Sequence, residues 1–370
     1  MTPILVAALL LVLAILLTRV LKTPSLLRPF AKSKSSQKPS EVISLRVYPI
    51  KSCRGFETTV AKQCMTGLDL DRRWMLVDEK THVFLTIRQI PEMTLINTAL
   101  SDDGQSLVLS VMSSSSEKGE AISTPAHPSP TWLAEHTTLV SDIKIWDTVT
   151  DGYVYSASVG VNQLFSRFLR RPVVLVYKGP TPRVLQGNGD PRLLGRVQDT
   201  NFPDVLPVLV ASQASIDELN GRLKAQGHEE ITIERFRPNI IIRGHRGDAW
   251  AEDSWKTVRI GTSITHAGFS NEKSVAGAGL EQEEEEEGLT YDIVARCGRC
   301  QVPNVDPETA QKHKTQPWDT MMSYRRVDEG LKYKPCFGML GVPRSEGEIR
   351  VGMKFEVLEE TSEHFYIKGF

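Results

Sequence analysis

The chain has 370 residues, of which 40% are hydrophobic and 24% charged, so it is long enough for two globular domains with proper cores. Its formal net charge of −1 excludes the uniformly basic surface of a nucleic-acid-binding protein, and we expect no nucleic-acid partner. The five cysteines are odd in number and irregularly spaced, which indicates a reducing compartment with free or metal-bound thiols.

The N-terminus predicts a membrane anchor. Residues 3–18 carry no charge, and with Arg19 and the next two residues the apolar stretch reaches about 19 residues, roughly enough to cross a bilayer. Basic residues follow this stretch rather than precede it, unlike those of a signal peptide. We therefore expect a transmembrane signal-anchor over residues 1–22, with the body of the protein on the cytosolic side. A short anchor with a basic flank suits the mitochondrial outer membrane, and the endoplasmic reticulum is compatible with the same pattern.

After a Ser-, Lys- and Pro-rich linker (23–42), the body has the composition of a β-rich protein. Runs of β-branched and aromatic residues predict strands, in chain order, at 43–50, 73–79, 82–89, 106–112, 142–156, 172–178, 237–244, 256–265, 349–360 and 364–370. The second and third of these runs predict a hairpin that turns at Lys80-Thr81.

Two segments have helical apolar spacing, 158–170 and 215–227. The second predicts an N-cap at Ser215 and a C-terminal stop at Gly227. Low-complexity residues 113–131 and the acidic insert 277–288 predict loops.

These elements predict a mainly β fold with some α structure, of the α+β class, in two β-rich parts over 43–175 and 176–370. Neither GxGxxG nor GxxxxGK[ST] occurs, so neither a dinucleotide-binding fold nor a P-loop is supported.

The run Cys297-Gly298-Arg299-Cys300 is the strongest candidate for chemistry. A structural zinc site needs a second pair of ligands, and a dithiol redox motif needs a thioredoxin-like βαβ setting. A third interpretation is a single thiolate ligand to a soft, redox-active metal, with the neighbouring arginines facing an anionic cofactor. Two buried small hydrophobic residues are the fourth. The pattern alone leaves all four open.

Two other stretches combine cations with turns. Lys51 and Ser52 follow a strand that breaks at Pro49, and a cation, a hydroxyl and exposed backbone N–H groups suit a phosphate or a pterin edge. Arg237 and Asn239 come just before an apolar strand and are positioned to project into a cleft. An ordinary surface turn and a strand-entry turn are the alternatives.

Together these stretches resemble the MOSC family of molybdenum-cofactor proteins, and within it the amidoxime-reducing components. The similarity follows the chain in order from 43 to 357 and is carried by "VYPIKSCRGFE", "LDRRWMLVDE", "TIRQIPEMTLI", "FRPNIII", "AEDSW" and "RCGRCQVPNVDPET". The resemblance implies an N-terminal β-rich MOSC domain over 43–175 and a MOSC β-barrel domain over 176–370.

The resemblance also implies the cofactor: a molybdenum ion held by a pterin dithiolene (molybdopterin), with a protein cysteine completing its sulfur ligands. Matched by motif, that cysteine is Cys300, the metal ligand and catalytic residue, whereas Cys297 is not the expected ligand. The other expected cofactor contacts are Lys51, Ser52, Arg72, Asp204, Arg237, Asn239, Gly298 and Arg299. Apolar residues replace polar residues of relatives at Val205, Leu206 and Leu340, so the resemblance implies no polar contact from these side chains.

The implied activity is the two-electron reduction of N-hydroxylated compounds, amidoximes to amidines and hydroxylamines to amines. The chain has no NAD or flavin motif, so we expect its electrons to come from another protein. The resemblance implies that the donors are cytochrome b5 and its NADH-dependent reductase. The alternative is a non-catalytic molybdenum-cofactor binding or sulfur-carrier protein, like the C-terminal part of a molybdenum-cofactor sulfurase.

Overall fold

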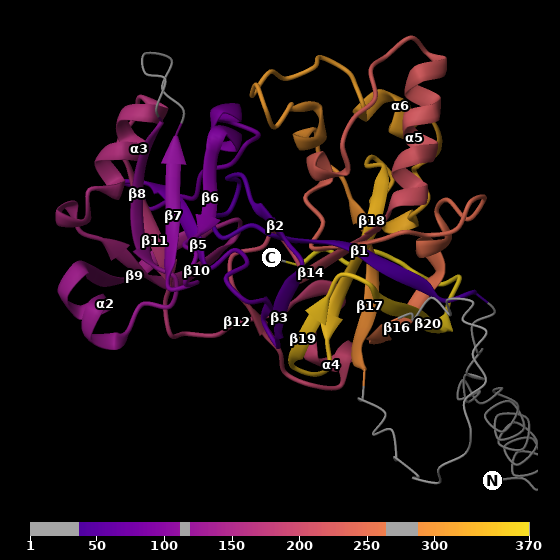
Figure 1. Cartoon of the computed structure of the whole chain (residues 1–370), viewed down its shortest axis with the longest axis horizontal. Coiled ribbons are helices and arrows are strands. Elements are labelled where there is room, and N and C mark those ends of the chain that lie inside the picture. The colour runs from indigo at the N-terminus through magenta and orange to yellow at the C-terminus, as the bar shows by residue number, and fades with distance from the viewer. Residues whose placement is uncertain (1–36, 112–118, 264–287, 370) are drawn as a thin grey trace, which may run out of the picture. The chain divides into compact units, whose positions relative to one another are not determined.

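Figure 1 shows the computed structural model of the chain, which describes residues 37–111, 119–263 and 288–369. The predicted anchor, most of the linker and all but the last residue of the acidic insert lie outside these ranges. Within them, no helix is long and apolar enough to span a bilayer.

Seven strands close into a barrel. They are β1 (Ser40–Val47), β14 (Val208–Ser212), β15 (Ile240–Ile242), β16 (Trp255–Ser263), β17 (Leu289–Gly298), β18 (Cys336–Pro343) and β20 (Met353–Glu360). The order is β15-β14-β18-β17-β16-β20-β1, and β1 pairs back to β15. All neighbours are antiparallel except β14 and β15, which run parallel.

The closing strand β1 begins within the last residues of the predicted linker. Its first residues pair with β20, where Ser40 faces Phe355, and its last residues pair with β2 (Phe56–Thr58). On its other side Leu45 faces Ile240 of β15. The strand therefore completes the barrel and then leads directly into the turn at Lys51.

The remaining strands form smaller sheets. One lobe combines the sheet β5 (Trp74–Asp78), β11 (Val173–Lys178), β10 (Thr148–Tyr155), β9 (Thr137–Ile145) with the sheet β6 (Ile96–Leu100), β7 (Ser106–Val111), β8 (Glu120–Pro125). At the barrel lie β19 (Gly347–Arg350), β3 (Val60–Cys64) and β4 (Gly67–Leu68), and the pair β12 (Arg183–Val184) and β13 (Asp199–Thr200).

Short helices cover these sheets. The α-helices are α2 (Pro130–His136), α3 (Val161–Leu169), α4 (Pro191–Leu194), α5 (Gln213–Ala225) and α6 (Trp318–Tyr324). The 3-10 helices are η1 (Pro91–Leu95), η2 (Ala157–Val159), η3 (Gly187–Gly189), η4 (Ile233–Phe236), η5 (Ala251–Ser254), η6 (Val302–Asn304) and η7 (Glu329–Leu331). Figure 1 shows α5 and α6 side by side next to β18 of the barrel.

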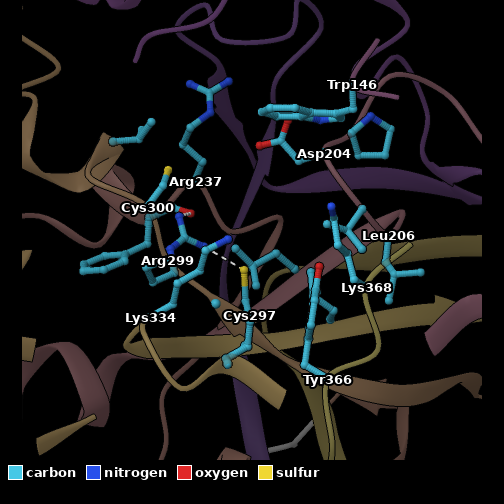
Figure 2. A pocket seen from close by; sticks show the side chains of 18 of the residues that line it. Trp146, Asp204, Leu206, Arg237, Cys297, Arg299, Cys300, Lys334, Tyr366 and Lys368 are labelled. Carbon is cyan, nitrogen blue, oxygen red and sulfur yellow. Dashed lines mark hydrogen bonds between the residues drawn. The ribbon is translucent and has the colours of Figure 1, made fainter. Parts of the chain in front are cut away.

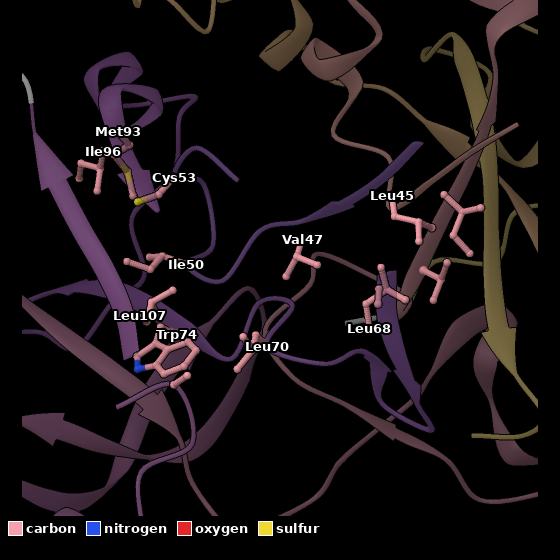
Figure 3. Close-up of a cluster of buried hydrophobic side chains, with 14 of the residues drawn as sticks. Leu45, Val47, Ile50, Cys53, Leu68, Leu70, Trp74, Met93, Ile96 and Leu107 are labelled. Carbon is pink, nitrogen blue, oxygen red and sulfur yellow. The ribbon is translucent and has the colours of Figure 1, made fainter. Parts of the chain in front are cut away.

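One apolar cluster joins the lobe to the barrel. It runs from Leu107 of β7 through Trp74 of β5 to Leu45 of β1, all fully buried (Figure 3). The indole N–H of Trp74 donates to the hydroxyl of Tyr155 at 2.9 Å, so the buried polar atom of this large side chain is satisfied. The shared core fixes the turn at Lys51 against the lobe.

The mainly β class is confirmed, as are helices close to 158–170 and 215–227. The helix cap at Ser215 is wrong: the helix begins at Gln213 after Ser212, and Ser215 lies buried inside it. Its hydroxyl donates to Glu252 at 2.8 Å and accepts from the backbone N–H of Trp250 at 2.8 Å. A serine with buried partners on another segment is thus not free to cap.

The predicted hairpin is only half right. The turn at Lys80-Thr81 is present, and Asp78 accepts hydrogen bonds from both backbone N–H groups. Residues 82–89 form no continuous strand: Phe84 makes an isolated antiparallel bridge to Val77 of β5, and the chain then turns at Thr86, whose carbonyl accepts from residues 89 and 90. The partner strand along the length of β5 is β11.

Three further predictions need correction. Part of the predicted loop 113–131 is ordered as β8 and α2. The run 349–360 splits into β19 and β20 around Gly352, whose φ of 91° makes the turn. Residues 364–369 form no strand, because side chains rather than a neighbouring strand bind their backbone.

Candidate functional site

A cavity of about 660 Å³ lies where the lobe, the barrel and the C-terminal segment meet. All nine residues that the resemblance assigns to the cofactor line it: Lys51, Ser52, Arg72, Asp204, Arg237, Asn239, Gly298, Arg299 and Cys300. These residues come from five separate stretches of the sequence. Figure 2 shows several of them around the same space.

Three of the nine expected residues have a left-handed backbone. The φ angles of Ser52, Arg72 and Arg237 are 67°, 49° and 58°. Such angles are uncommon outside glycine, and they concentrate at ligand sites where the surrounding structure enforces them. In each case a turn leads into or out of a strand, so the turn aims a polar side chain at the cavity.

Lys51 and Asp204 form an ion pair at one wall. Lys51 is 4% exposed, and its Nζ also donates to the carbonyl of Phe202 at 3.0 Å. Burial lowers the pKa of Lys51 to about 8, and Asp204 opposes that shift. Although burial alone acts against it, the neighbouring Lys51 and Arg88 hold the pKa of the Asp204 carboxyl well below its usual range. The wall therefore carries fixed opposite charges at neutral pH.

Two arginines stack on one buried tyrosine. The guanidinium carbons of Arg72 and Arg237 lie 4.5 and 4.3 Å from the ring centroid of Tyr48. Arg72 donates to the Asp71 carboxylate at 2.5 Å. The Arg237 guanidinium donates from Nη1 to the carbonyl of Cys53 at 2.7 Å, and its buried Nη2 has no partner among the described residues. Burial, then Arg72, lowers the pKa of Arg237, so this guanidinium is suited to an anion that the protein does not supply.

The two cysteines have different surroundings, although both are free thiols. Arg299 donates from Nη1 to the Sγ of Cys297 at 3.0 Å and from Nη2 to the carbonyl of Phe236 at 2.8 Å. Burial raises the pKa of the Cys297 thiol, against the effect of Arg299. Cys300 follows β17 and faces the cavity without this contact (Figure 2).

Gly298 allows the loop around η7 to approach the cysteine pair. A Cβ at this position would lie 2.6 Å from the Cδ1 of Leu331, closer than real contacts allow. A side chain here would push away the 330–334 loop, which lines the cavity. The glycine therefore sets the distance between this loop and Cys300.

Asn239 holds two strands together. It is 1% exposed, its Oδ1 accepts from the backbone N–H of Leu209 at 3.1 Å, and its Nδ2 donates to the carbonyl of Arg46 at 3.2 Å. The side chain thus fixes β14 and β1 beside the cavity that it also lines.

Charge is the dominant property of the cavity. Its lining includes eight cationic side chains, four of them outside the expected set, and two carboxylates. The Nη2 of Arg237 and the Nε of Arg299 are buried donors without a partner among the described residues, which also favours an anionic ligand. Such a lining suits a ligand with several negative charges, such as a phosphorylated pterin dithiolene.

The alternatives for the cysteine pair fit less well. Within the described residues, no three His, Cys, Asp or Glu side chains are arranged to hold a metal, which disfavours a structural zinc site. Cys297 lies in β17 and Cys300 just after it, before a single 3-10 turn and not before the long helix that lowers a thiol pKa in dithiol enzymes. Facing an anion-binding cavity, Cys300 is suited to act as a single thiolate ligand.

Other lining residues are not among the expected contacts, although Arg88 lies within the stretch "TIRQIPEMTLI" that carries part of the resemblance. Arg88, Trp146 and Asp147 come from the lobe, Lys332 to Lys334 come from the loop after η7, and Tyr366, Lys368 and Gly369 come from the C-terminal segment. Only the packing of distant segments brings them here. The apolar residues Val205, Leu206 and Leu340 also line the cavity.

Comparison with known proteins agrees with this geometry. The MOSC N-terminal beta barrel domain profile matches residues 40–172, and the MOSC domain profile matches 198–356. Human mitochondrial amidoxime-reducing component 1 is 28% identical over 333 residues, covering 88% of this chain and 85% of that protein. Human mitochondrial amidoxime reducing component 2 is 27% identical over 328 residues, 85% of this chain and 83% of that protein.

A plant protein extends the comparison. The molybdenum cofactor sulfurase of Arabidopsis thaliana is 31% identical over 322 residues, 84% of this chain, and the chain spans about a third (34%) of its length. The first profile covers β1 and most of the lobe, and the second covers the other barrel strands up to the start of β20. The chain therefore belongs to the MOSC family, with a MOSC N-terminal beta barrel domain followed by a MOSC domain.

Proposed function

We propose that this protein is a molybdenum-cofactor-dependent reductase of N-hydroxylated compounds, such as amidoximes and hydroxylamines. The observation that carries the proposal is the joint lining of one cavity by Cys300 and a predominantly cationic set of side chains. The names of the human relatives, similar over most of both chains, support the reaction class.

Each lining residue has a place in this proposal. Cys300 supplies the thiolate to the metal, and a thiolate suits a soft, redox-active ion. Arg237 and Arg299 offer unpaired buried donors to the pterin and its phosphate. Lys51 and Arg72 add fixed positive charge, which needs little reorganisation when charge moves in the site. When bound, molybdenum supplies the two-electron redox chemistry, and the protein supplies position and charge.

The reaction balances with two electrons and two protons. An amidoxime R–C(NH2)=N–OH takes both and gives the amidine R–C(NH2)=NH and water, with cleavage of the N–O bond. The Lys51 ammonium, with a pKa of about 8, keeps its proton at neutral pH beside the cavity. Because the sequence has no NAD or flavin motif, the electrons come from another protein in this proposal, and the resemblance to the amidoxime-reducing components leads us to propose cytochrome b5 and its NADH-dependent reductase.

The test uses the full chain purified with its cofactor. Molybdenum is measured by elemental analysis and the pterin by fluorescence of its oxidised form. The protein is then mixed with cytochrome b5, its reductase, NADH and benzamidoxime. Benzamidine formation that depends on every component supports the proposal, and molybdenum-replete protein that forms no benzamidine contradicts it.

A second candidate follows from the similarity to the plant sulfurase. In that case the protein binds or carries the cofactor or its sulfur and does not turn over substrate. The benzamidoxime assay and a transfer assay together separate the two functions. A carrier leaves benzamidoxime unchanged and transfers molybdenum or pterin to a cofactor-free acceptor enzyme.

We further propose that residues 1–22 anchor the protein in the mitochondrial outer membrane, with the described residues on the cytosolic side. Deletion of residues 1–22 is expected to release the protein from membranes with its reductase activity intact. Fractionation with mitochondrial and endoplasmic reticulum markers identifies the membrane, and a deletion variant that stays membrane-bound contradicts the anchor.

A further inference from the structure

A segment beyond the MOSC match forms one side of the cavity. The match ends at residue 356, whereas Tyr366, Lys368 and Gly369 line the cavity. We call residues 361–369 the C-terminal wall. In Figure 2, Tyr366 and Lys368 lie on the opposite side of the cavity from Cys300 and Arg237. The wall therefore faces the space beside the expected metal position.

Buried polar side chains hold the wall in place. Asn188, 8% exposed, accepts from the backbone N–H of Ile367 at 2.7 Å and donates to the carbonyl of Phe365 at 2.9 Å. Its Nδ2 also lies 3.2 Å from the carbonyl of Val294 in β17. At Gly187, a Cβ would lie 2.5 Å from the carbonyl oxygen of Ile367. The wall is thus fastened to β17, the barrel strand that carries Cys297 and leads to Cys300.

A second clamp joins the wall to the loop after η7. The Asp328 carboxylate accepts from the backbone N–H groups of Tyr366 and Gly330, each at 2.9 Å. Its side chain is fully buried and lies 3.5 Å from Arg296, which also donates to the carbonyl of His364 at 3.0 Å. Because unpaired buried polar groups are costly, these contacts define one position for the wall.

The wall and its neighbours place positive charge around the cavity, where Lys368 and Arg88 each also approach a carboxylate. Lys368, 85% exposed, lies 3.9 Å from Asp147, and Arg88 stacks on Trp146 at 4.5 Å and lies 3.8 Å from Asp204. Two exposed lysines, at positions 332 and 334, also line the cavity. We call Arg88, Lys332, Lys334 and Lys368 the rim cations. None of the four belongs to the contacts expected for the cofactor.

We propose that the C-terminal wall determines substrate specificity, and that Lys368, with the other rim cations, selects N-hydroxylated compounds that carry an acidic group. The inference rests on the proposed reductase function and deepens it. Two unit charges a few ångströms apart in a partly exposed site change affinity about three- to ten-fold, and salt screens the effect. The wall carries such a charge on a segment whose backbone is held at the cavity.

The test compares matched substrates on the full, cofactor-loaded chain: 4-carboxybenzamidoxime, neutral benzamidoxime and a 4-trimethylammonio analogue. We expect kcat/KM to be about ten-fold higher for the carboxylate than for the cation at low salt, and the ratio to approach one as ionic strength rises. Lys368→Glu is expected to lower the ratio about ten-fold. Lys224→Glu, an exposed lysine on α5 outside the cavity lining, is the matched control and leaves the ratio unchanged.

A binding measurement makes the inference independent of turnover. Calorimetric titration with benzoate and with neutral benzamide is expected to show tighter benzoate binding, lost in Lys368→Glu. A preference for the cationic analogue, or equal kcat/KM ratios in the wild type and Lys368→Glu, overturns the proposal that the wall selects acidic substrates. Reduction of benzamidoxime in the same experiment would still support the reductase function. If no amidoxime is reduced, the proposed function fails, and the benzoate titration alone decides whether the wall selects anions.

Discussion

The Arg299 guanidinium donates to the sulfur of Cys297 at 3.0 Å, so the arginine between the two cysteines contacts the first of them. Cys300 lines the same cavity without this contact. Because Cys297 is buried enough for the pKa of its thiol to rise, its thiolate form is disfavoured. The structure thus separates two thiols that the sequence places only three residues apart.

Replacement of each cysteine tests this separation. Cys300→Ser is expected to lower turnover of benzamidoxime at least a hundred-fold and to change the electron paramagnetic resonance signal of the metal, because the ligand sulfur is lost. Cys297→Ser keeps a hydroxyl that accepts from Arg299, so we expect less than a ten-fold loss and an unchanged signal. The reverse pattern would show that Cys297 is the ligand.

Asn239 is expected to matter for stability even without a cofactor. Asn239→Ala leaves the Leu209 N–H and the Arg46 carbonyl without their buried partner, at a cost of about 2–3 kcal/mol. Urea unfolding of cofactor-free protein measures the loss. Asn239→Asp keeps the acceptor for Leu209 and is the matched control. We expect its stability to lie between those of the wild type and Asn239→Ala. An alanine variant with unchanged stability would leave only a ligand contact as the role of this residue.

Gly298 tests the spacing between the cysteine pair and the η7 loop. Gly298→Ala forces a Cβ against Leu331 and is expected to cost about 1–3 kcal/mol of stability, as overpacking does elsewhere. The double variant Gly298→Ala/Leu331→Ala removes the clash, so its loss should be smaller than the sum of the two single losses. Strict additivity in thermal unfolding would contradict this explanation.

Glu252 predicts a pH dependence. Its carboxyl is fully buried, and burial raises its pKa to about 7, only partly offset by the hydrogen bond from Ser215. The folded state therefore holds a proton that the unfolded state loses above pH 4.5, and stability falls as pH rises from 4.5 to 7.

Glu252→Gln removes this titration. We expect the variant to be about 2 kcal/mol more stable than the wild type at pH 8 and equally stable near pH 4.5. Denaturant unfolding at both pH values measures the difference. A constant gap between the two proteins would assign the effect to packing and not to the proton.

The sequence predicted the β class, the barrel strand β1 and most strands of the lobe, because β-branched residues leave a clear pattern at 43–50, 106–112 and 172–178. It missed β14, β17 and β18, which include the strand that carries Cys297. β18 contains two glycines, and one of them, Gly338, has a φ of 73° where the strand bends. Local pattern alone does not distinguish such a strand from a loop.

The nine expected site residues came from motif similarity, and the structure places all of them at one cavity. Trp146 and Tyr366 show no comparable signal, whereas Arg88 lies in one of the stretches that carry the resemblance. Trp146 and Tyr366 reach the cavity through tertiary packing, and the backbone of Tyr366 is positioned by Asp328, a residue far away in the sequence. A single sequence contains no pattern that predicts a hydrogen bond between two such distant residues.

The closure of the barrel has a consequence for synthesis. β1 must pair with β15 and β20, which the ribosome makes much later, so the nascent strand waits with unsatisfied backbone groups. The barrel therefore closes only after translation, and truncated translation products expose unpaired strand edges to chaperones and proteases. Loading of a polyanionic prosthetic group is expected only after release, once both ends of the ring have met.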